Sequence, residues 1–159
     1  MRIRLSALLV ATAAAILLFG SSLFAQDAQG RLWDAAIAGD TLAIRAALAD
    51  GAKIDSLDTR RNPNGRLALN WAAWHDRVPA IEMLLAMGAP IEAENRTGFS
   101  ALHHAAEAGS MEAARALLAA GADPLHANKA GSTPAVTARA QGNDEVAALI
   151  EEAAQADPQ

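Results

Sequence analysis

The chain has 159 residues, of which 52% are hydrophobic, 19% charged and 4% aromatic, and it contains no cysteine. That length suits one compact domain or a short repeat array, and the lack of cysteine excludes a disulfide scaffold, thiolate metal sites and a cysteine nucleophile. The formal net charge is −5, and residues 26–159 carry 11 basic against 18 acidic side chains, a balance that argues against nucleic-acid binding. Abundant alanine and the absence of tyrosine favour helices over sheets.

Residues 1–25 are predicted to form a secretory signal peptide. Arg2 and Arg4 supply the positive start, residues 5–19 form the apolar stretch, and small residues follow before the polar Gln26. We therefore expect the remaining chain to be exported to the periplasm or secreted.

The fate of this N-terminal segment has alternatives. Cleavage after Ala25 places Leu23 at the −3 position, which is tolerated but not ideal, and cleavage after Ser22, with Gly20 at −3, is the second option. An uncleaved membrane anchor is the competing interpretation, because an apolar segment of about 20 residues approaches the length that spans a bilayer. The cleaved form would have no membrane contact.

The remaining chain repeats with a period of 33 residues, which is typical of a solenoid of stacked structural units. Gly51 and Gly88 occupy corresponding positions but are 37 residues apart, and the extra residues lie in the segment 58–64, which carries Arg60 and Arg61. We interpret this insertion as a tolerated loop, with an extended binding surface as the alternative. The period is carried by Gly65, Gly98 and Gly131, by Ala72, Ala105 and Ala138, and by Gly109 and Gly142.

One segment resembles an ankyrin repeat from end to end. It reads Gly98-Phe99-Ser100-Ala101-Leu102-His103-His104-Ala105-Ala106, then Gly109, Leu117-Leu118 and Gly121-Ala122-Asp123. The resemblance extends over residues 31–153 and is greatest to the small ankyrin proteins that bacteria export. It implies an all-α solenoid of antiparallel helix pairs with β-turn fingers, and a role in binding other proteins.

Four stacked ankyrin repeats and a short frayed tail are expected after the signal peptide. Capping hydroxyls at Ser100 and Thr133 should start the inner helices of the third and fourth repeats, whereas Leu67 leaves the second repeat without such a cap. The apolar stripes of the outer helices place Leu84 and Leu117 in the core. The ankyrin domain is expected at residues 31–154, with repeats at 31–58, 59–94, 95–127 and 128–154 and the tail at 155–159.

His103, His104 and Glu107 form the cluster that most resembles catalytic or metal-binding chemistry. His103 and Glu107 are four residues apart on a predicted helix, within reach of one metal ion. The family resemblance implies a structural role instead, because His103 matches a histidine that bonds the turn hydroxyl, here Ser100, and neighbouring backbone. We therefore predict no catalytic residue, no metal and no cofactor.

The three tryptophans are expected to have different roles. Trp33 and Trp71 are interpreted as core residues. Trp74 and His75 occupy slots that small or polar residues fill in the next two repeats, and the resemblance implies that these slots line the concave groove. A large aromatic residue exposed there is typical of a binding hot spot, and packing on the next repeat is the alternative for Trp74.

The fingers extend this predicted surface. Phe99 beside Trp74 is expected to form an apolar centre with a charged rim, a mixture usual in protein interfaces, although any single finger arginine could simply be solvated. The predicted protein-binding residues are Trp74, His75, Phe99, Arg96, Arg66, Glu107 and Lys129.

The sequence thus predicts a non-enzymatic, monomeric, exported module that binds a protein or peptide on its concave face. Four repeats offer enough surface for an interface of about 800 Å² per partner. The resemblance to exported bacterial ankyrin proteins also implies a role as accessory to a stress-defence enzyme. The alternatives are a membrane-anchored scaffold with an uncleaved N-terminal helix and a metal-dependent hydrolase that uses His103, His104 and Glu107.

Overall fold

The computed structural model describes residues 27–156, so the predicted signal peptide and residues 157–159 lie outside the described residues. Within the described range the chain is helical, and its one extended pairing is an isolated antiparallel bridge between Asp58 and Arg66. This confirms the all-α fold class. The helices are a first helix over residues 27–38, then α2 (Thr41–Ala49), α3 (Ala68–Trp74), α4 (Val78–Ala86), α5 (Ala101–Ala108), α6 (Met111–Ala119), α7 (Pro134–Ala140) and α8 (Asp144–Ala156).

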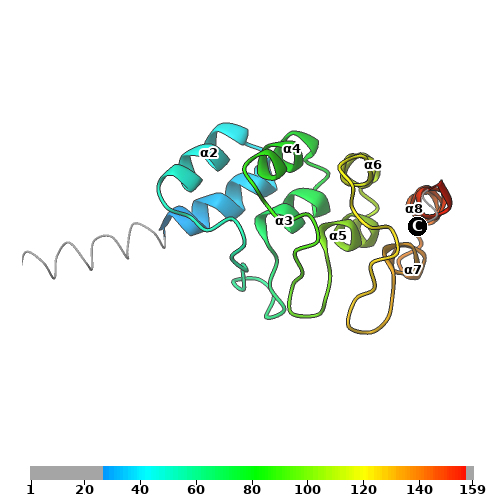
Figure 1. Cartoon of the computed structure of the whole chain (residues 1–159). Coiled ribbons are helices and arrows are strands. Elements are labelled where there is room, and N and C mark those ends of the chain that lie inside the picture. Colours follow the sequence, from blue (N-terminus) through cyan, green and yellow to red (C-terminus); the bar gives the residue numbers. More distant parts are fainter. Residues whose placement is uncertain (1–26, 157–159) are drawn as a thin grey trace, which may run out of the picture.

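The helices form antiparallel pairs that stack in a row (Figure 1). Helices α3, α5 and α7 pack side by side as an inner layer, and α2, α4, α6 and α8 form the outer layer. The long loops that precede α3, α5 and α7 project from the inner side as fingers. One face of the stack therefore consists of inner helices and fingers, as expected for the predicted solenoid.

The inner helices begin at the predicted capping residues. Ser100 and His103 make a reciprocal capping box at the start of α5, and the Thr133 hydroxyl accepts a backbone N–H at the start of α7. Leu67 precedes α3 without a side-chain cap, as its sequence predicts. Because a capping side chain satisfies an otherwise unpaired N–H, α3 relies more heavily on packing than α5 and α7 do.

The turn after α3 differs from the equivalent turns of the later repeats. Asp76 stands where the other repeats have Gly109 and Gly142, and it adopts the left-handed conformation at φ +56°. Its carboxylate accepts the Ala113 N–H of α6 at 2.6 Å. This hydrogen bond to the next repeat offsets the conformational cost of a side chain at that position.

The core combines small residues on the inner helices with large residues on the outer ones. Ala72, Ala105 and Ala138 have no exposed surface, and their small side chains allow the inner helices to approach closely. Leu84 of α4 and Leu117 of α6 are also fully buried within the same hydrophobic cluster, which confirms their predicted core positions. Burial of a leucine side chain contributes roughly 1.5–3 kcal/mol, so these residues carry much of the stability of the stack.

Both ends of the repeat domain extend beyond the predicted bounds of residues 31 and 154. The first helix already includes residues 27–30, and Ala28 is fully buried against the core. Helix α8 continues to Ala156, so Gln155 and Ala156 belong to the helix and not to a frayed tail. The alanine-rich end of α8 has a high helix propensity, which explains its extra length.

Candidate protein-binding site

Asparagine side chains hold the fingers of the third and fourth repeats. Asn95 Oδ1 accepts the backbone N–H groups of Thr97 (2.9 Å) and Phe99 (3.0 Å). Asn128 Oδ1 makes the same pair of contacts with Ala130 (2.9 Å) and the residue two further on (3.1 Å). A short side chain that accepts hydrogen bonds from backbone N–H groups later in the chain stabilises a turn, because it replaces the hydrogen bonds that a regular helix or strand would provide. Each finger is therefore a locally determined structure.

The longer finger of the second repeat uses two such residues. The Asp58 N–H donates to the Arg66 carbonyl at 2.8 Å, and the Asn95 N–H donates to the Phe99 carbonyl in the equivalent way one repeat later. The Asp58 carboxylate also accepts the backbone N–H of Arg60, two residues ahead. Asn62 adds a second turn by accepting the Asn64 N–H at 2.8 Å. These turn residues were not predicted from the sequence, although the 33-residue spacing of Asn62, Asn95 and Asn128 is a signal that could have identified most of them.

Neighbouring fingers are joined to one another. The Arg96 N–H donates to the Asn64 carbonyl (3.0 Å), and the Lys129 N–H donates to the Thr97 carbonyl (3.2 Å). Side chains repeat this pattern, since Arg96 Nη1 donates to the Pro63 carbonyl (2.6 Å) and Lys129 Nζ to the Arg96 carbonyl (2.9 Å). The fingers thus form one preorganised wall, which reduces the entropy lost when a partner binds.

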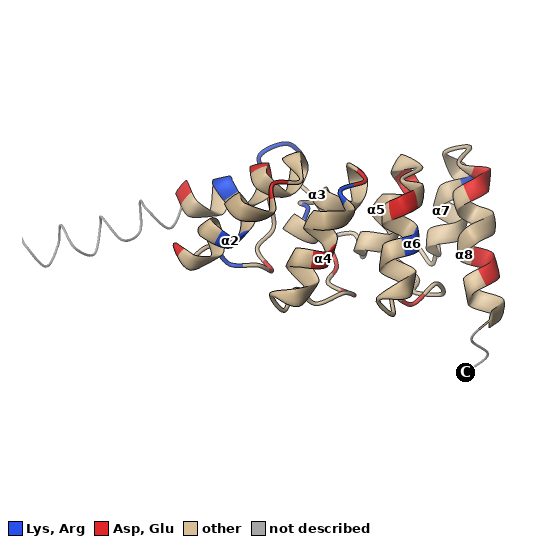
Figure 2. Cartoon of the chain, turned by 90° about the horizontal axis from the view of Figure 1, so that it is seen from above, with Lys and Arg blue, Asp and Glu red and all other residues tan. Residues whose placement is uncertain are grey.

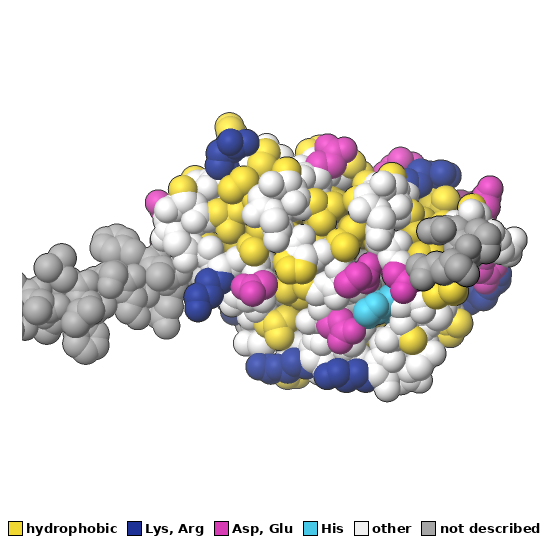
Figure 3. Space-filling model, viewed as in Figure 1, with side chains coloured by type: hydrophobic (Ala, Val, Ile, Leu, Met, Phe, Trp, Pro, Cys, Tyr) yellow, Lys and Arg dark blue, Asp and Glu magenta, His cyan; other side chains and the backbone are white. Residues whose placement is uncertain are grey.

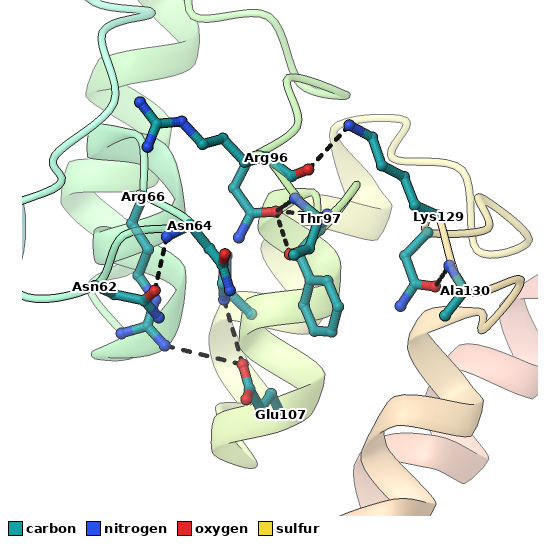
Figure 4. A pocket seen from close by; sticks show the side chains of 12 residues that line it. Asn62, Asn64, Arg66, Arg96, Thr97, Glu107, Lys129 and Ala130 are labelled. Carbon is teal, nitrogen blue, oxygen red and sulfur yellow. Dashed lines mark hydrogen bonds and ion pairs between the residues drawn. The ribbon is translucent and has the colours of Figure 1, made fainter.

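A hollow of about 520 Å³ lies between the fingers and α5 (Figure 4). Phe99 is its large apolar side chain, and Arg66, Arg96, Glu107 and Lys129 are its charged ones. Figure 4 shows Arg66 and Glu107 pointing toward each other across it. The other lining residues are Asn62, Asn64, Asn95, Thr97, His104, Asn128 and Ala130.

Arg66 contacts two indole rings at one side of the hollow. Its guanidinium carbon is 4.6 Å from the centroid of Trp71 and 4.0 Å from that of Trp74, distances at which the cation is attracted to the ring faces. Arg66 Nη2 lies 3.9 Å from Glu107 Oε2, and the Arg66 side chain is only 13% exposed. Burial lowers the pKa of Arg66, and the Glu107 charge opposes that shift.

His104 lies beneath the hollow between two aromatic side chains. Its ring centroid is 5.6 Å from that of Phe99 and 6.2 Å from that of Trp74. The residue is 2% exposed, and its Nδ1 approaches Glu107 Oε2 to 3.4 Å without hydrogen-bond geometry. Neither ring nitrogen has a hydrogen-bond partner among residues 27–156. Burial lowers the pKa of His104 despite the nearby carboxylate, so the ring is neutral at pH 7.

His103 has the structural role that the family resemblance implies. Its Nδ1 lies 3.1 Å from the Ser100 hydroxyl oxygen, and its Nε2 lies 3.0 Å from the Ser132 carbonyl. Both ring nitrogens are therefore used to hold the start of α5 and the next finger. Glu107 faces Arg66 and His104 instead of His103. Among the described residues, no group of three or more His, Cys, Asp or Glu side chains is arranged to hold a metal ion.

The structure brings together most of the predicted site, with two differences. Trp74 is half-buried behind the Arg66 guanidinium, and His104 separates it from Phe99, so the expected single aromatic centre does not form. His75 stacks on Trp71 with a centroid distance of 5.9 Å and does not line the hollow. The predicted residues that do line it are Arg66, Arg96, Phe99, Glu107 and Lys129.

The predicted loop insertion is also more ordered than the sequence indicated. Arg60 donates from Nε and Nη2 to the Asp58 carboxylate (2.9 and 3.0 Å) and from Nη2 to Asp34 (2.9 Å). The Arg60 guanidinium lies 4.9 Å from the Trp33 centroid, and Trp71 Nε1 donates to Asp58 at 3.1 Å. The interpretation of this segment as a merely tolerated loop is wrong for Arg60, because its side chain neutralises a buried carboxylate. Trp71 is 4% exposed, which confirms its predicted core position.

The family description "ankyrin repeats (3 copies)" matches residues 32–128 and 78–159. The chain belongs to the ankyrin-repeat family. Over 99 residues it is 33% identical to B-cell lymphoma 3 protein homolog of Mus musculus, covering 62% of the chain and 21% of that protein. It is also 32% identical over 105 residues to ankyrin repeat domain-containing protein SAT10 of Stachybotrys chartarum, covering 66% of the chain and 5% of that protein.

A third relative is nearer in size to this ankyrin-repeat chain. Protein phosphatase 1 regulatory subunit 27 of Mus musculus is 37% identical over 79 residues, which cover 50% of the chain and 51% of that protein. The chain therefore matches at most about half the length of these three relatives. Ankyrin repeats are protein–protein interaction modules, and stacked repeats present an extended binding surface. In the part of the chain that the structure describes, no helix has both the length and the apolar character needed to cross a membrane.

Proposed function

We propose that this ankyrin-repeat protein binds a protein or peptide partner on the face formed by its inner helices and fingers, and that it acts without catalysing a reaction. The preorganised hollow between the fingers is the observation that carries the proposal. It offers an apolar ring, Phe99, with charged side chains around it, an arrangement typical of protein interfaces.

The proposal includes export from the cytoplasm in monomeric form. The N-terminal segment with Arg2 and Arg4, followed by an apolar stretch, supports this step, and a retained membrane anchor is its alternative. A mature protein that begins after Ser22 or Ala25 would support cleavage, whereas Met1 at the N-terminus in a membrane fraction would support the anchor. An exported stress-defence enzyme is the partner class that the resemblance to bacterial proteins favours.

Affinity capture with a double variant tests the binding face. Trp74→Ala combined with Phe99→Ala should weaken capture of the partner by about 1 kcal/mol or more, because Phe99 lines the hollow and Trp74 contacts the Arg66 guanidinium at its side. Leu42→Ala combined with Arg115→Ala is the matched control, since both residues are exposed on outer helices. Retention of the partner by the first variant and its loss in the control would place the interface on the outer helices. Circular dichroism of both variants separates lost binding from lost folding.

A further inference from the structure

The finger end of the hollow carries positive charges that no acidic side chain of the described residues neutralises. Arg96 and Lys129 donate to the backbone carbonyls of Pro63 and Arg96, and neither forms an ion pair with a carboxylate among residues 27–156. Both side chains are exposed. The chain as a whole has a net charge of −5, so this is a local reversal of sign.

The wider distribution of charge supports the same view. Acidic residues lie along the outer helices, including Glu112 at the start of α6 and Asp144 and Glu145 at the start of α8 (Figure 2). Some of the Lys and Arg side chains lie along the finger edge of the molecule, and others lie over the outer helices and toward the two ends (Figure 3). Electrostatic complementarity of this kind selects partners and orients their approach.

On the other side of the hollow, the positive charge of Arg66 is only partly neutralised by a nearby carboxylate. Its side chain is 13% exposed, and its one ionic contact among the described residues is Glu107, at the long distance of 3.9 Å. Its Nε is buried and has no hydrogen-bond partner within this range. A guanidinium that is shielded from water in this way is stabilised most strongly by an anion that accepts hydrogen bonds from two of its N–H groups at once.

A buried histidine at the floor of the hollow also has unsatisfied hydrogen-bonding capacity. The buried His104 ring lines the hollow; its Nε2 has no hydrogen-bond partner among the described residues, and its Nδ1 has only the 3.4 Å contact with Glu107 Oε2. Buried polar groups in folded proteins are nearly always hydrogen-bonded, and an exception needs an explanation such as a ligand. Arg66 Nη2 and His104 Nδ1 both approach the same oxygen, Glu107 Oε2, at 3.9 and 3.4 Å, so a single carboxylate lies near both groups.

We propose that this hollow binds an acidic segment of the partner, whose Asp or Glu carboxylates accept hydrogen bonds from Arg66, Arg96 and Lys129. The inference rests on the proposed function, because it specifies the chemistry of the partner on that face. Three cations and one carboxylate line the hollow, so a basic segment is disfavoured. Phe99 provides an apolar wall for the methylene groups of the bound side chains.

Fluorescence anisotropy with labelled hexapeptides tests the charge preference. Hexaglutamate is the probe, and hexaglutamine and hexalysine are its uncharged and basic counterparts. We expect the purified chain to bind hexaglutamate about ten-fold more tightly than hexaglutamine, with affinity that falls as salt is raised. Equal affinity for hexaglutamate and hexaglutamine, or a preference for hexalysine, would overturn the proposal.

Paired charge-removing variants test the location. Arg96→Gln with Lys129→Gln should weaken hexaglutamate binding about five-fold or more, because both residues line the hollow and carry exposed positive charges. Arg45→Gln with Arg115→Gln removes the same charge from exposed positions on outer helices and should change binding less than about two-fold. An equal loss in both variants would show that net charge alone governs binding and would refute the assigned site.

The same finger variant separates this inference from the proposed function. If Arg96→Gln with Lys129→Gln still captures a partner that Trp74→Ala with Phe99→Ala loses, the binding face stands and the acidic segment is wrong. If the finger variant and the aromatic variant both lose the partner while the outer-helix controls retain it, both proposals are supported.

Discussion

Arg60 donates two side-chain hydrogen bonds to Asp58, a carboxylate with no exposed surface, at 2.9 and 3.0 Å. Burial raises the pKa of Asp58, but the hydrogen bonds from Arg60, its charge and the bond from Trp71 together hold that pKa below its usual value. The second-repeat finger is thereby connected to the first repeat, because Arg60 also pairs with Asp34.

Arg60→Ala should therefore lower the free energy of unfolding by about 1–3 kcal/mol, the cost of leaving a buried polar group without its partner. Arg61→Ala is the matched control, since Arg61 is exposed and lies 5.8 Å from the Trp71 centroid, and it should change stability by less than about 0.5 kcal/mol. Urea unfolding followed by circular dichroism measures both. If both substitutions changed the free energy of unfolding by equally small amounts, the contacts of Arg60 would not contribute to the stability of the repeat stack.

Leu117 supports the centre of the stack and gives the second prediction. It is fully buried on α6 within the hydrophobic cluster, so Leu117→Ala should cost about 2–5 kcal/mol through lost burial and the cavity left behind. Leu42→Ala provides the comparison, because Leu42 is 79% exposed, and should be nearly neutral. A Leu117→Ala variant with an unchanged unfolding midpoint would contradict a core role for Leu117, because the lost burial alone should lower stability.

The buried histidines predict how stability depends on pH. Burial lowers the pKa values of His103 and His104, so their unfolded forms take up protons first as the pH falls. The stability that their neutral forms provide is complete above the unfolded pKa of about 6.5 and declines below it, by at most about 1.4 kcal/mol per pH unit for each histidine. Asp58 affects stability at lower pH, because its pKa is lowered in the folded chain and its contribution to the free energy of unfolding is lost only below about pH 4.

Unfolding midpoints in urea between about pH 7.5 and pH 5 measure this slope. His104→Phe should make the slope shallower, because one of the two buried titrating groups is removed. His103→Phe is less suitable, since the ring nitrogens of His103 also bond Ser100 and Ser132. A slope that His104→Phe leaves unchanged would mean that His104 has the same pKa in the folded and the unfolded chain.

The sequence predicts the fold well because every repeat packs against its neighbours in the same way and therefore needs similar residues at equivalent positions. Ala72, Ala105 and Ala138 recur because the inner helices must approach closely, and each is fully buried. Ser100 and Thr133 recur because the same helix start must be capped. The register of the fingers follows from this period, and it places Phe99, Arg96 and Lys129 near one another before any coordinates are known.

The contacts that shape the hollow are not periodic, and the sequence did not reveal them. Arg66 stacks on Trp71 and Trp74, an arrangement that depends on how a long side chain crosses from its finger to α3. His104 lies between Phe99 and Trp74 for a similar reason, since rings from two repeats meet there. Such contacts depend on side-chain conformations in three dimensions, which spacing along the chain does not determine.

Gly98 gives the last prediction, because its finger touches the next one. It has φ +82°, and a Cβ built on it would lie 2.6 Å from the backbone nitrogen of Lys129. Gly131 occupies the same turn position one repeat later with φ +79°, but no atom lies within 4 Å of its Cβ position. Gly131→Ala thus measures the conformational cost alone, about 1–2 kcal/mol for a left-handed residue.

Gly98→Ala should be the more damaging of the two, since it adds a backbone clash that the finger can relieve only by moving away from Lys129. That movement would break the hydrogen bond from the Lys129 N–H to the Thr97 carbonyl and widen the hollow. Thermal unfolding should rank the variants wild type, Gly131→Ala, Gly98→Ala in falling stability. Binding of hexaglutamate should weaken more in Gly98→Ala than in Gly131→Ala, because a mobile wall loses its preorganisation. Equal midpoints and equal affinities in the two variants would show that the contact between these fingers has no part in holding the site.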